Sequence, residues 1–403
     1  MGSVIRLLTF LVRDGVCLVL VGVGVFGCSA CPNGGPSPLP DAPALTTVCY
    51  HPAETPPADG LPSALGMPVP LPPTLSRPLQ MLALSGGVAG APFTAGVLVG
   101  WSRLGTRPMF DRVTGVSSGS LIGALAFLGP KYDNRIQNLI LTMNTSDLIE
   151  FRPLRCMVRD GAFGSAKPAE RLIRRAFDDG FMVDLRQAHA EGRRFFVATM
   201  NLETKRLAVW DLGALASSGR PDADELTRKV LLAAVSWPGA VPPVAFDIEV
   251  NGRCYREEHC DAGSVAMALP PFGTLADCPP GSNLYVLASR KLYSDPTPVP
   301  RRALCRLKPS VSAIFEALTR ADIARIHSLC MLSALRFHLL ALPQEYSGEA
   351  PSLMHLYPKE APRLFETGYQ CGLRGPCWRY TPPGAEPGEE AIPRDGREIK
   401  RCP

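Results

Sequence analysis

The sequence predicts an α/β sandwich with a mostly parallel central sheet. Short apolar runs alternate with amphipathic segments along the chain, which is typical of parallel strands joined by helices. Glycine-rich turns directly follow two of these runs, at residues 85–90 and 115–119. The chain of 403 residues, 46% of them hydrophobic and 20% charged, is long enough to bury a large core.

The N-terminus has the pattern of an export signal. Two arginines precede the apolar run 15–26, and small residues follow it. The run is shorter than the ~20 apolar residues that a membrane-spanning helix needs, and its end resembles a bacterial lipobox with Cys28 as the lipidated residue. We expect a signal peptide with a lipobox over residues 1–27. The alternative is an uncleaved anchor helix over residues 4–27, which would place a charged pair inside the membrane.

Proline dominates the next segment, residues 28–78, and predicts an extended spacer. A lipid on Cys28 and this spacer together predict a lipid-anchored membrane protein of the cell envelope that faces the periplasm, or a secreted protein. We expect the main domain over residues 79–345. An extension over residues 346–403 is expected to pack on this domain.

The expected core elements begin with a buried strand over residues 79–84, which glycines end. Residues 91–105 follow as a helix. Residues 110–119 then give a second short strand and its turn, and residues 117–129 give a second helix. Strands and helices therefore alternate over this part of the domain.

A strand pair and a hairpin are expected in the middle of the chain. Residues 193–202 and 205–213 form the pair, and residues 244–263 alternate around an Asn-Gly turn, which is a strong hairpin signal. Between them, residues 223–239 predict an amphipathic helix that Pro238 ends. Later elements are a buried strand at 282–289, more than one helix within 309–342, and a surface-wrapping tail after Pro343.

The turn "GVSSG" fits the pattern G-x-S-x-G in one register, with Gly115, Ser117 and Gly119 at its fixed positions. A nucleophile elbow needs a strand, a sharp turn and a helix, because the serine is strained and its neighbours must be small. Ser117 would then leave the carboxyl edge of the sheet at a helix start, where the helix dipole favours developing negative charge. Ser118 would lie in the first helical turn. The alternative is an ordinary glycine-rich turn of an α/β protein.

The loop after the first strand is a second candidate element. Gly86, Gly87 and Val88 lie between a buried strand and a helix. Glycines let backbone N–H groups converge on an oxyanion without a Cβ in the way. A phosphate-binding loop is the alternative, but neither G-x-G-x-x-G nor a Walker lysine is present. We expect these three residues to form an oxyanion hole.

A base for the serine is the third element. Asp261 ends a strand of the expected hairpin and meets a small-residue turn, which makes it the stronger candidate. The alternative is a triad that uses His327 or His338, both expected in an amphipathic helical stretch. His259 lies two residues before Asp261, so strand alternation predicts that both side chains point to the same face.

These motifs, in this order, resemble the bacterial patatin-like phospholipases. The likeness is densest over residues 82–133 and continues in "SWPGAVPPV" and "YREEHCDAG". It implies a three-layer α/β/α sandwich and a lipid acyl hydrolase of phospholipase A type. It also implies a Ser–Asp dyad that works through an acyl-enzyme without histidine, metal or cofactor. By position, Ser117 matches the nucleophile, Asp261 matches the base, and the expected oxyanion hole matches the family's glycine loop.

Three positions depart from the family pattern. Val88 stands where a third glycine is common, Gly90 stands where a basic or polar residue often follows, and Ala262 replaces the glycine after the aspartate. A β-branched Val88 resists a positive φ, so a hole that needs this geometry would be distorted. Three alternatives therefore stay open: a weakened enzyme, a histidine-dependent esterase, and a non-catalytic envelope lipoprotein that binds lipid or a partner.

Net charge and sequence motifs limit the classes of ligand and partner that the protein is expected to bind. The net charge of +5 is mild and no basic patch with interleaved aromatic residues occurs, so nucleic acid is not expected. The expected partners are a membrane lipid substrate and the membrane itself, whereas protein partners stay unknown. No CxxC is accompanied by a second CxxC or an HxxxH, so no zinc site is expected. The 13 cysteines fit an oxidising compartment, in which Cys371–Cys377 and Cys254–Cys260 are candidate disulfides.

Overall fold

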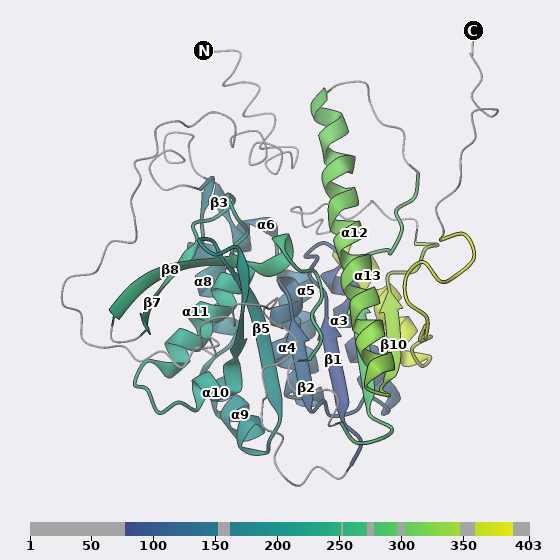
Figure 1. Ribbon diagram of the computed structural model, residues 1–403, viewed down its shortest axis with the longest axis horizontal. Coiled ribbons are helices and arrows are strands. Elements are labelled where there is room, and N and C mark those ends of the chain that lie inside the picture. The colour runs from purple at the N-terminus through teal and green to yellow at the C-terminus, as the bar shows by residue number, and fades with distance from the viewer. Residues whose placement is uncertain are drawn as a thin grey trace, which may run out of the picture.

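A mixed, mostly parallel sheet forms the centre of the structure (Figure 1). The computed structural model describes residues 77–151, 162–250, 253–271, 278–296, 303–346 and 359–389. Within them the strands of this sheet are β1 (Gln80–Leu84), β2 (Arg112–Gly115), β5 (Arg194–Asn201), β6 (Arg206–Asp211), β7 (Val244–Val250), β8 (Arg253–Asp261), β9 (Asn283–Ala288) and β10 (Arg336–Ala341).

The strand order is β10-β9-β1-β2-β5-β8-β7, and β6 pairs with β5 beside this path. The five strands from β10 to β5 are parallel to their neighbours. In contrast, β6, β7 and β8 are held in antiparallel pairs. The predicted α/β class with a mostly parallel sheet is therefore confirmed, and the strand pair and the hairpin form its antiparallel margin.

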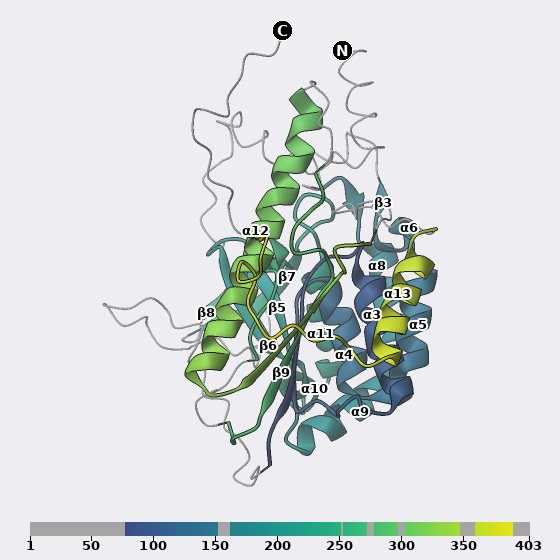
Figure 2. The same cartoon turned by 90° about the vertical axis from the view of Figure 1, so that its right-hand side faces the viewer.

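Helices cover both faces of the sheet, which gives three layers (Figure 2). The long helix α12 (Ala303–Leu332) lies on one face. The other face carries α3 (Ala91–Leu104), α4 (Ser118–Phe127), α5 (Asp133–Thr142), α8 (Lys167–Ala176), α9 (Asp179–Ala190), α10 (Leu212–Ala216), α11 (Ala223–Val235) and α13 (Ala361–Leu373). Short elements fill the connections: η2 (Pro130–Tyr132), α6 (Thr145–Leu148), the pair β3 (Glu150–Phe151) and β4 (Gly164–Ser165), and η3 (Ala262–Ser264).

Strand β1 shows why its sequence is a continuous apolar run. Leu82 and Leu84 pack into the cluster under α3 and α4, whereas Met81 and Ala83 pack into the cluster under α12. Successive side chains of a strand point to opposite faces, so a strand that is covered on both sides must be apolar throughout. This burial fixes β1 in the middle of the sheet and presents its following loop at the sheet's carboxyl edge.

One expectation for the C-terminal part was wrong, and one helix there was not predicted. Residues 309–342 are not all helical, because α12 ends at Leu332 and β10 follows it as a strand. In β10, Phe337 and Leu339 face the α12 cluster while Leu340 faces the opposite one, which is the period-2 pattern of a strand. The tail after Pro343 also contains a full helix, α13, in addition to irregular segments.

Helix α13 packs directly along α3. Gly96 and Gly100 of α3 face Gly368 and Gly372 of α13, so the two helix backbones touch. A Cβ added to Gly96 or Gly368 would lie 2.1 Å from a carbonyl oxygen of the facing helix. Any larger residue at these positions would separate the helices.

Among the residues that it describes, the structure does not support the candidate disulfides. Cys371 and Cys377 are both free thiols, and so is Cys260. Cys371 lies on α13 and packs partly against the core, while Cys377 is exposed. The side chain of Cys254 lies outside the described part of the structure, as do residues 1–27, Cys28 and the spacer up to residue 76. Among the described helices, none combines the length and the apolar character that crossing a membrane requires.

Candidate active site

The register of the sheet brings Ser117 and Asp261 to the same level. Gly115 of β2 pairs with Val197 of β5, and Thr199, two residues further along β5, pairs with Asp261 at the end of β8. Ser117 likewise lies two residues beyond Gly115. The serine and the carboxylate therefore meet at the carboxyl edge of the sheet, although they are far apart in the sequence.

Ser117 has a strained backbone. Its φ is 54° and its ψ is −129°, and only two other non-glycine residues of the described chain, Lys205 and Ala334, have a positive φ. Such strain persists only where the surrounding structure enforces it. Here α4 begins at Ser118, and Gly119 allows this helix to approach β1, because a Cβ on Gly119 would lie 2.7 Å from the carbonyl oxygen of Leu84. This is the geometry of a nucleophile elbow.

The Ser117 side chain is close enough to the Asp261 carboxylate to lower its pKa. The Asp261 carboxylate is buried, with 1% of the residue exposed, and its Oδ1 accepts the Gly263 N–H at 2.7 Å. Burial raises the pKa of Asp261 to about 6, and the neighbouring Ser117 hydroxyl and the Gly263 N–H oppose this rise. The Asp261 N–H donates to the Ser236 carbonyl oxygen at 2.9 Å, which fixes the backbone. A buried carboxylate with a raised pKa is a stronger base than an ordinary aspartate.

The loop after β1 offers two free amides. The Gly86 N–H donates to the Met267 carbonyl oxygen at 2.9 Å, so it does not contribute to an oxyanion hole as expected. In the part of the chain that the structure describes, the N–H groups of Gly87 and Val88 have no hydrogen-bond partner. Gly87 has a φ of 130°, which only glycine adopts readily. Val88 is not among the residues with positive φ, so the distortion expected from its β-branched side chain is absent.

The space at Gly90 explains another departure from the family pattern. A Cβ there would lie 1.6 Å from the Ser289 carbonyl oxygen, so no side chain fits at this position. Ala262 is buried and packs with Val116 and Ala198. Ala262, which stands where the family has a glycine, is thus a small core residue that does not displace the Asp261 carboxylate.

A narrow cavity of about 70 Å³ surrounds the serine and the aspartate. Its apolar wall comes from the start of α4, from α6 and the residues beside it, from α11 and its following loop, and from α12: Leu121, Met143, Leu148, Ile149, Val235, Trp237, Val241 and Phe315. Its polar groups include the Ser118 hydroxyl, which is buried without a hydrogen-bond partner, and the Arg290 guanidinium. The cavity therefore presents reactive oxygens beside an apolar surface, as a site for acyl esters requires.

The histidines considered for a triad lie elsewhere. His338 is on β10, not on a helix, and its Nε2 donates to Asn283 Oδ1 at 2.9 Å while its ring stacks on Tyr285. His327 packs edge-on against Phe337. Within the described residues, no histidine lines the cavity around Ser117.

His259 is fully buried beneath the site. Its Nδ1 lies 2.8 Å from Thr199 Oγ1 and its Nε2 lies 3.1 Å from Glu257 Oε2. Thr199 also accepts the Trp210 Nε1–H at 2.7 Å. These hydrogen bonds hold the β5–β8 pairing next to Asp261 and do not reach Ser117.

Residues 82–272 match the family model of the patatin-like phospholipases. This part of the chain is therefore similar to a patatin-like phospholipase domain, and we refer to it below as the patatin-like domain. Both Ser117 and Asp261 fall inside the matched residues.

No curated protein matches the sequence. Among solved structures, the crystal structure of VipD from Legionella pneumophila matches 74% of this chain with 12% sequence identity and a TM-score of 0.35. The match covers 66% of the VipD chain, slightly less than two thirds of its length.

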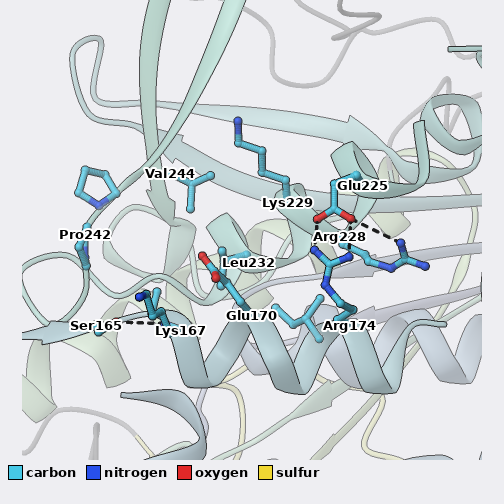
Figure 3. A pocket seen from close by; sticks show the side chains of 13 residues that line it. Ser165, Lys167, Glu170, Arg174, Glu225, Arg228, Lys229, Leu232, Pro242 and Val244 are labelled. Carbon is cyan, nitrogen blue, oxygen red and sulfur yellow. Dashed lines mark hydrogen bonds and ion pairs between the residues drawn. The ribbon is translucent and has the colours of Figure 1, made fainter. Parts of the chain in front are cut away.

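A second and larger cavity, of about 440 Å³, opens beside α8 and α11 of the patatin-like domain (Figure 3). Three of its six charged side chains form ion pairs: Arg174, Glu225 and Arg228. Glu225 lies between two guanidinium groups and accepts both Arg174 hydrogen bonds, at 2.9 and 2.6 Å. Arg228 donates to Asp179 and to the Phe177 carbonyl oxygen. This cavity contains neither Ser117 nor Asp261.

Sequence reasoning missed several residues of the site. Trp237 and Phe315 form its apolar wall and contact each other, with ring centroids 5.4 Å apart. Arg290 lies three residues beyond Leu287, which pairs with Leu84, so the register brings it level with the loop after β1. Its position after a buried strand was a usable signal, because parallel strands end at the same edge.

Proposed function

We propose that the patatin-like domain cleaves acyl esters of membrane lipids with a Ser117–Asp261 dyad, and that a lipid on Cys28 tethers it to its substrate. The observation that carries the proposal is that the strained Ser117 and the buried Asp261 line one cavity, beside two unpartnered amides. Nucleophile, base and oxyanion donors thus lie within one cavity, as acyl transfer requires.

The first half of the reaction forms an acyl-enzyme. Asp261 accepts the Ser117 proton while Oγ attacks the ester carbonyl carbon. The carbonyl oxygen becomes an oxyanion that the Gly87 and Val88 N–H groups stabilise, together with the dipole at the start of α4. When the C–O bond breaks, the protonated Asp261 returns the proton to the departing alcohol oxygen. The acyl group remains on Ser117.

The second half uses the same groups with water as the nucleophile. Asp261 accepts a proton from water, whose oxygen attacks the acyl carbon. The tetrahedral intermediate then collapses, Ser117 regains its proton from Asp261, and the fatty acid leaves. One carboxylate therefore serves both halves, and its raised pKa keeps the proton transfers nearly balanced near neutral pH.

The apolar wall supports a lipid substrate. Apolar side-chain surface surrounds the serine, and an acyl chain can pack against it without hydrogen bonds; it comes from Leu121, Met143, Trp237 and Phe315. Each buried methylene contributes about 0.8 kcal/mol to binding such a chain.

Labelling with a fluorophosphonate tests the nucleophile. The reagent should modify Ser117 in the wild-type protein, and peptide mapping should locate the adduct on the peptide that contains "GVSSG". Ser117→Ala should abolish labelling, while the neighbouring Ser118→Ala should retain it. Labelling that persists in Ser117→Ala overturns the assignment.

The membrane tether is tested separately. Cys28→Ser should move the protein from the membrane fraction to the soluble fraction, because the lipid attachment point is lost while the spacer remains. A Cys28→Ser protein that stays in the membrane with an intact N-terminus would instead support the uncleaved anchor helix.

A further inference from the structure

The larger cavity, beside α8 and α11, takes no part in the proposed reaction. Its volume of about 440 Å³ lies in the range of pockets that hold small organic ligands. Part of its lining is apolar and buried, namely Ile173, Leu232 and Val244, and Pro242 and Pro243 add further apolar surface. A hydrocarbon group can therefore pack inside this cavity without leaving a polar group unsatisfied.

The lining of the larger cavity carries more positive than negative charge. Four cationic side chains face two carboxylates: Lys167, Arg174, Arg228 and Lys229 on one side of the balance, and Glu170 and Glu225 on the other. Dashed lines in Figure 3 join Glu225 to the two arginines, whereas none reaches Lys229. The excess of positive charge therefore belongs to the two lysines.

Lys229 is half-buried and has no acidic partner in contact. Its ammonium forms no hydrogen bond or ion pair with a described residue, and its Nζ lies 4.9 Å from the centroid of the Phe246 ring. Burial lowers the pKa of Lys229, while Asp247 and Asp222 attract the charge through space and Arg256 repels it. The face of an aromatic ring replaces only part of the water that a lysine loses. An anion in the cavity would supply the missing acceptor.

The two cavities share a wall. Ala166, which directly precedes α8, lines both of them. Val241 lines the cavity of Ser117, and the next residue, Pro242, lines the larger cavity. The larger cavity is therefore adjacent to the place where the acyl group leaves Ser117.

We propose that the larger cavity binds the fatty acid that the reaction releases, with its carboxylate at Lys229 and Lys167 and its chain against Leu232. This rests on the proposed function, because hydrolysis of an acyl ester yields a fatty acid. A fatty acid is an amphiphilic anion at neutral pH, so it needs a cation and an apolar wall together. The larger cavity offers both and contains neither Ser117 nor Asp261, so the product site is separate from the catalytic one.

Calorimetry with decanoate tests the site in the Ser117→Ala protein. Lys229→Gln should weaken binding by about tenfold, the lower end of the range for a lost hydrogen bond to a charged group, because Lys229 is only half-buried. Lys359→Gln is the matched control, since it removes the same charge from an exposed position that does not line the cavity. It should leave binding unchanged. Equal weakening by both variants would overturn the proposal, and so would no weakening by Lys229→Gln.

A variant of opposite sign guards against loss of folding. Glu170 is an exposed carboxylate of the same cavity and repels an anion there. Glu170→Gln should therefore tighten decanoate binding by about twofold to fivefold. Damage to the fold does not tighten binding, so this result supports the site whatever the stability of the other variants. Weaker binding by Glu170→Gln would contradict an anion in the cavity.

The chemistry of the ligand is tested by varying decanoate. Octanoate is shorter by two methylenes and should bind about tenfold more weakly, because each buried methylene contributes about fourfold. Decyltrimethylammonium has the same chain with a positive head, and should also bind more weakly by about tenfold or more. If inorganic phosphate binds as tightly as decanoate, the cavity takes a small free anion and the fatty-acid assignment is wrong.

Inhibition of the wild-type enzyme separates this inference from the proposed function. Decanoate should not compete with a short-chain ester at concentrations near its dissociation constant. If its competitive inhibition constant equals that dissociation constant, decanoate binds beside Ser117 and the inference fails while the hydrolase stands. If the wild-type protein hydrolyses no acyl ester but the Lys229-dependent binding is present, the proposed function fails while the fatty-acid site stands.

Discussion

The two cavities of the patatin-like domain differ in how their polar groups are satisfied. The larger one, at about 440 Å³, contains several charged side chains, and its arginines are paired with acidic groups of the same cavity or its rim. The one around Ser117, at about 70 Å³, contains a hydroxyl, a guanidinium and two backbone amides that lack protein partners. Unsatisfied polar groups are costly, so a fold retains them where a ligand completes them. Hydrogen-bond accounting therefore identifies the site better than volume does.

Removing either member of the dyad should have the largest effect. Ser117→Ala and Asp261→Asn should each lower kcat by about 10⁴-fold or more, and the double variant should be no worse, because the two residues act as one unit. Initial rates on a short-chain ester measure this. Ser118→Ala, His259→Ala, His327→Ala and His338→Ala are the controls. A histidine variant that loses as much as Ser117→Ala would restore the triad hypothesis.

A substitution at Gly87, in the loop that carries the two free amides, should have the second largest effect on catalysis. Gly87→Ala should lower kcat by about 10²–10³-fold, the cost of losing one oxyanion donor. The reason is geometric, since alanine does not adopt a φ of 130° without strain and its Cβ would lie 3.2 Å from the Ser289 Cβ. KM should change much less than kcat. A Gly87→Ala enzyme with wild-type kcat would mean that this amide faces no reaction intermediate.

The rate should depend on pH through Asp261. Only the ionised carboxylate accepts the serine proton, so kcat/KM should rise about tenfold per pH unit below about pH 6 and level off above it. A pH profile on an uncharged short-chain ester measures this without substrate titration. A profile that is flat from pH 4.5 to pH 7 would rule out a carboxylate base with a raised pKa.

Ionisation of the Asp261 carboxylate should lower the free energy of unfolding. Its folded-state pKa of about 6 lies above the ordinary value of 3.8, so the folded protein binds more protons than the unfolded chain between these values, and stability falls as pH rises through this window. Asp261→Asn lacks this effect. Its unfolding free energy relative to wild type should increase from pH 4 to pH 7 by up to about 3 kcal/mol. Urea unfolding at both pH values tests this, and a constant difference would contradict it.

The larger cavity should respond least. Arg174→Gln breaks the ion pair with Glu225, whose side chains are 64% and 54% exposed. Stability should fall by less than about 1 kcal/mol, and activity should stay within about twofold of wild type. A loss of activity comparable to Gly87→Ala would show that this cavity belongs to the working site, and the comparison of the two cavities would break down.

The parts of the molecule that the sequence could predict are those with local signals. The buried strand at β1, the elbow at Ser117 and the hairpin that ends at Asp261 each depend on neighbouring residues. In contrast, the Gly86 N–H is not available to an oxyanion because it donates to the Met267 carbonyl oxygen. Met267 is remote in sequence and becomes adjacent to Gly86 only when the chain folds. The Arg290 position likewise depends on β9 lying next to β1, and strand order is a tertiary property.

The missed elements had ambiguous patterns. Residues 336–341 are a short apolar run, which periodicity does not distinguish from part of a helix. Helix α8 was overlooked because half of its ten residues are charged, although its apolar face packs well: Pro168, Ala169, Leu172, Ile173 and Ala176 are buried. Amphipathic helices of this kind are recognised by spacing and not by composition.

The contact between α3 and α13 has a consequence for synthesis of the chain. Helix α3 starts directly after the loop that carries the Gly87 and Val88 amides. Among the described residues, its glycine face packs against α13, near their C-terminal end. Chains emerge from the ribosome N-terminus first, at about 5–20 residues per second. The nascent protein therefore exposes this face until α13, residues 361–373, has left the ribosome. A product of early termination lacks α13, so the helix that follows the Gly87–Val88 loop has lost its packing partner.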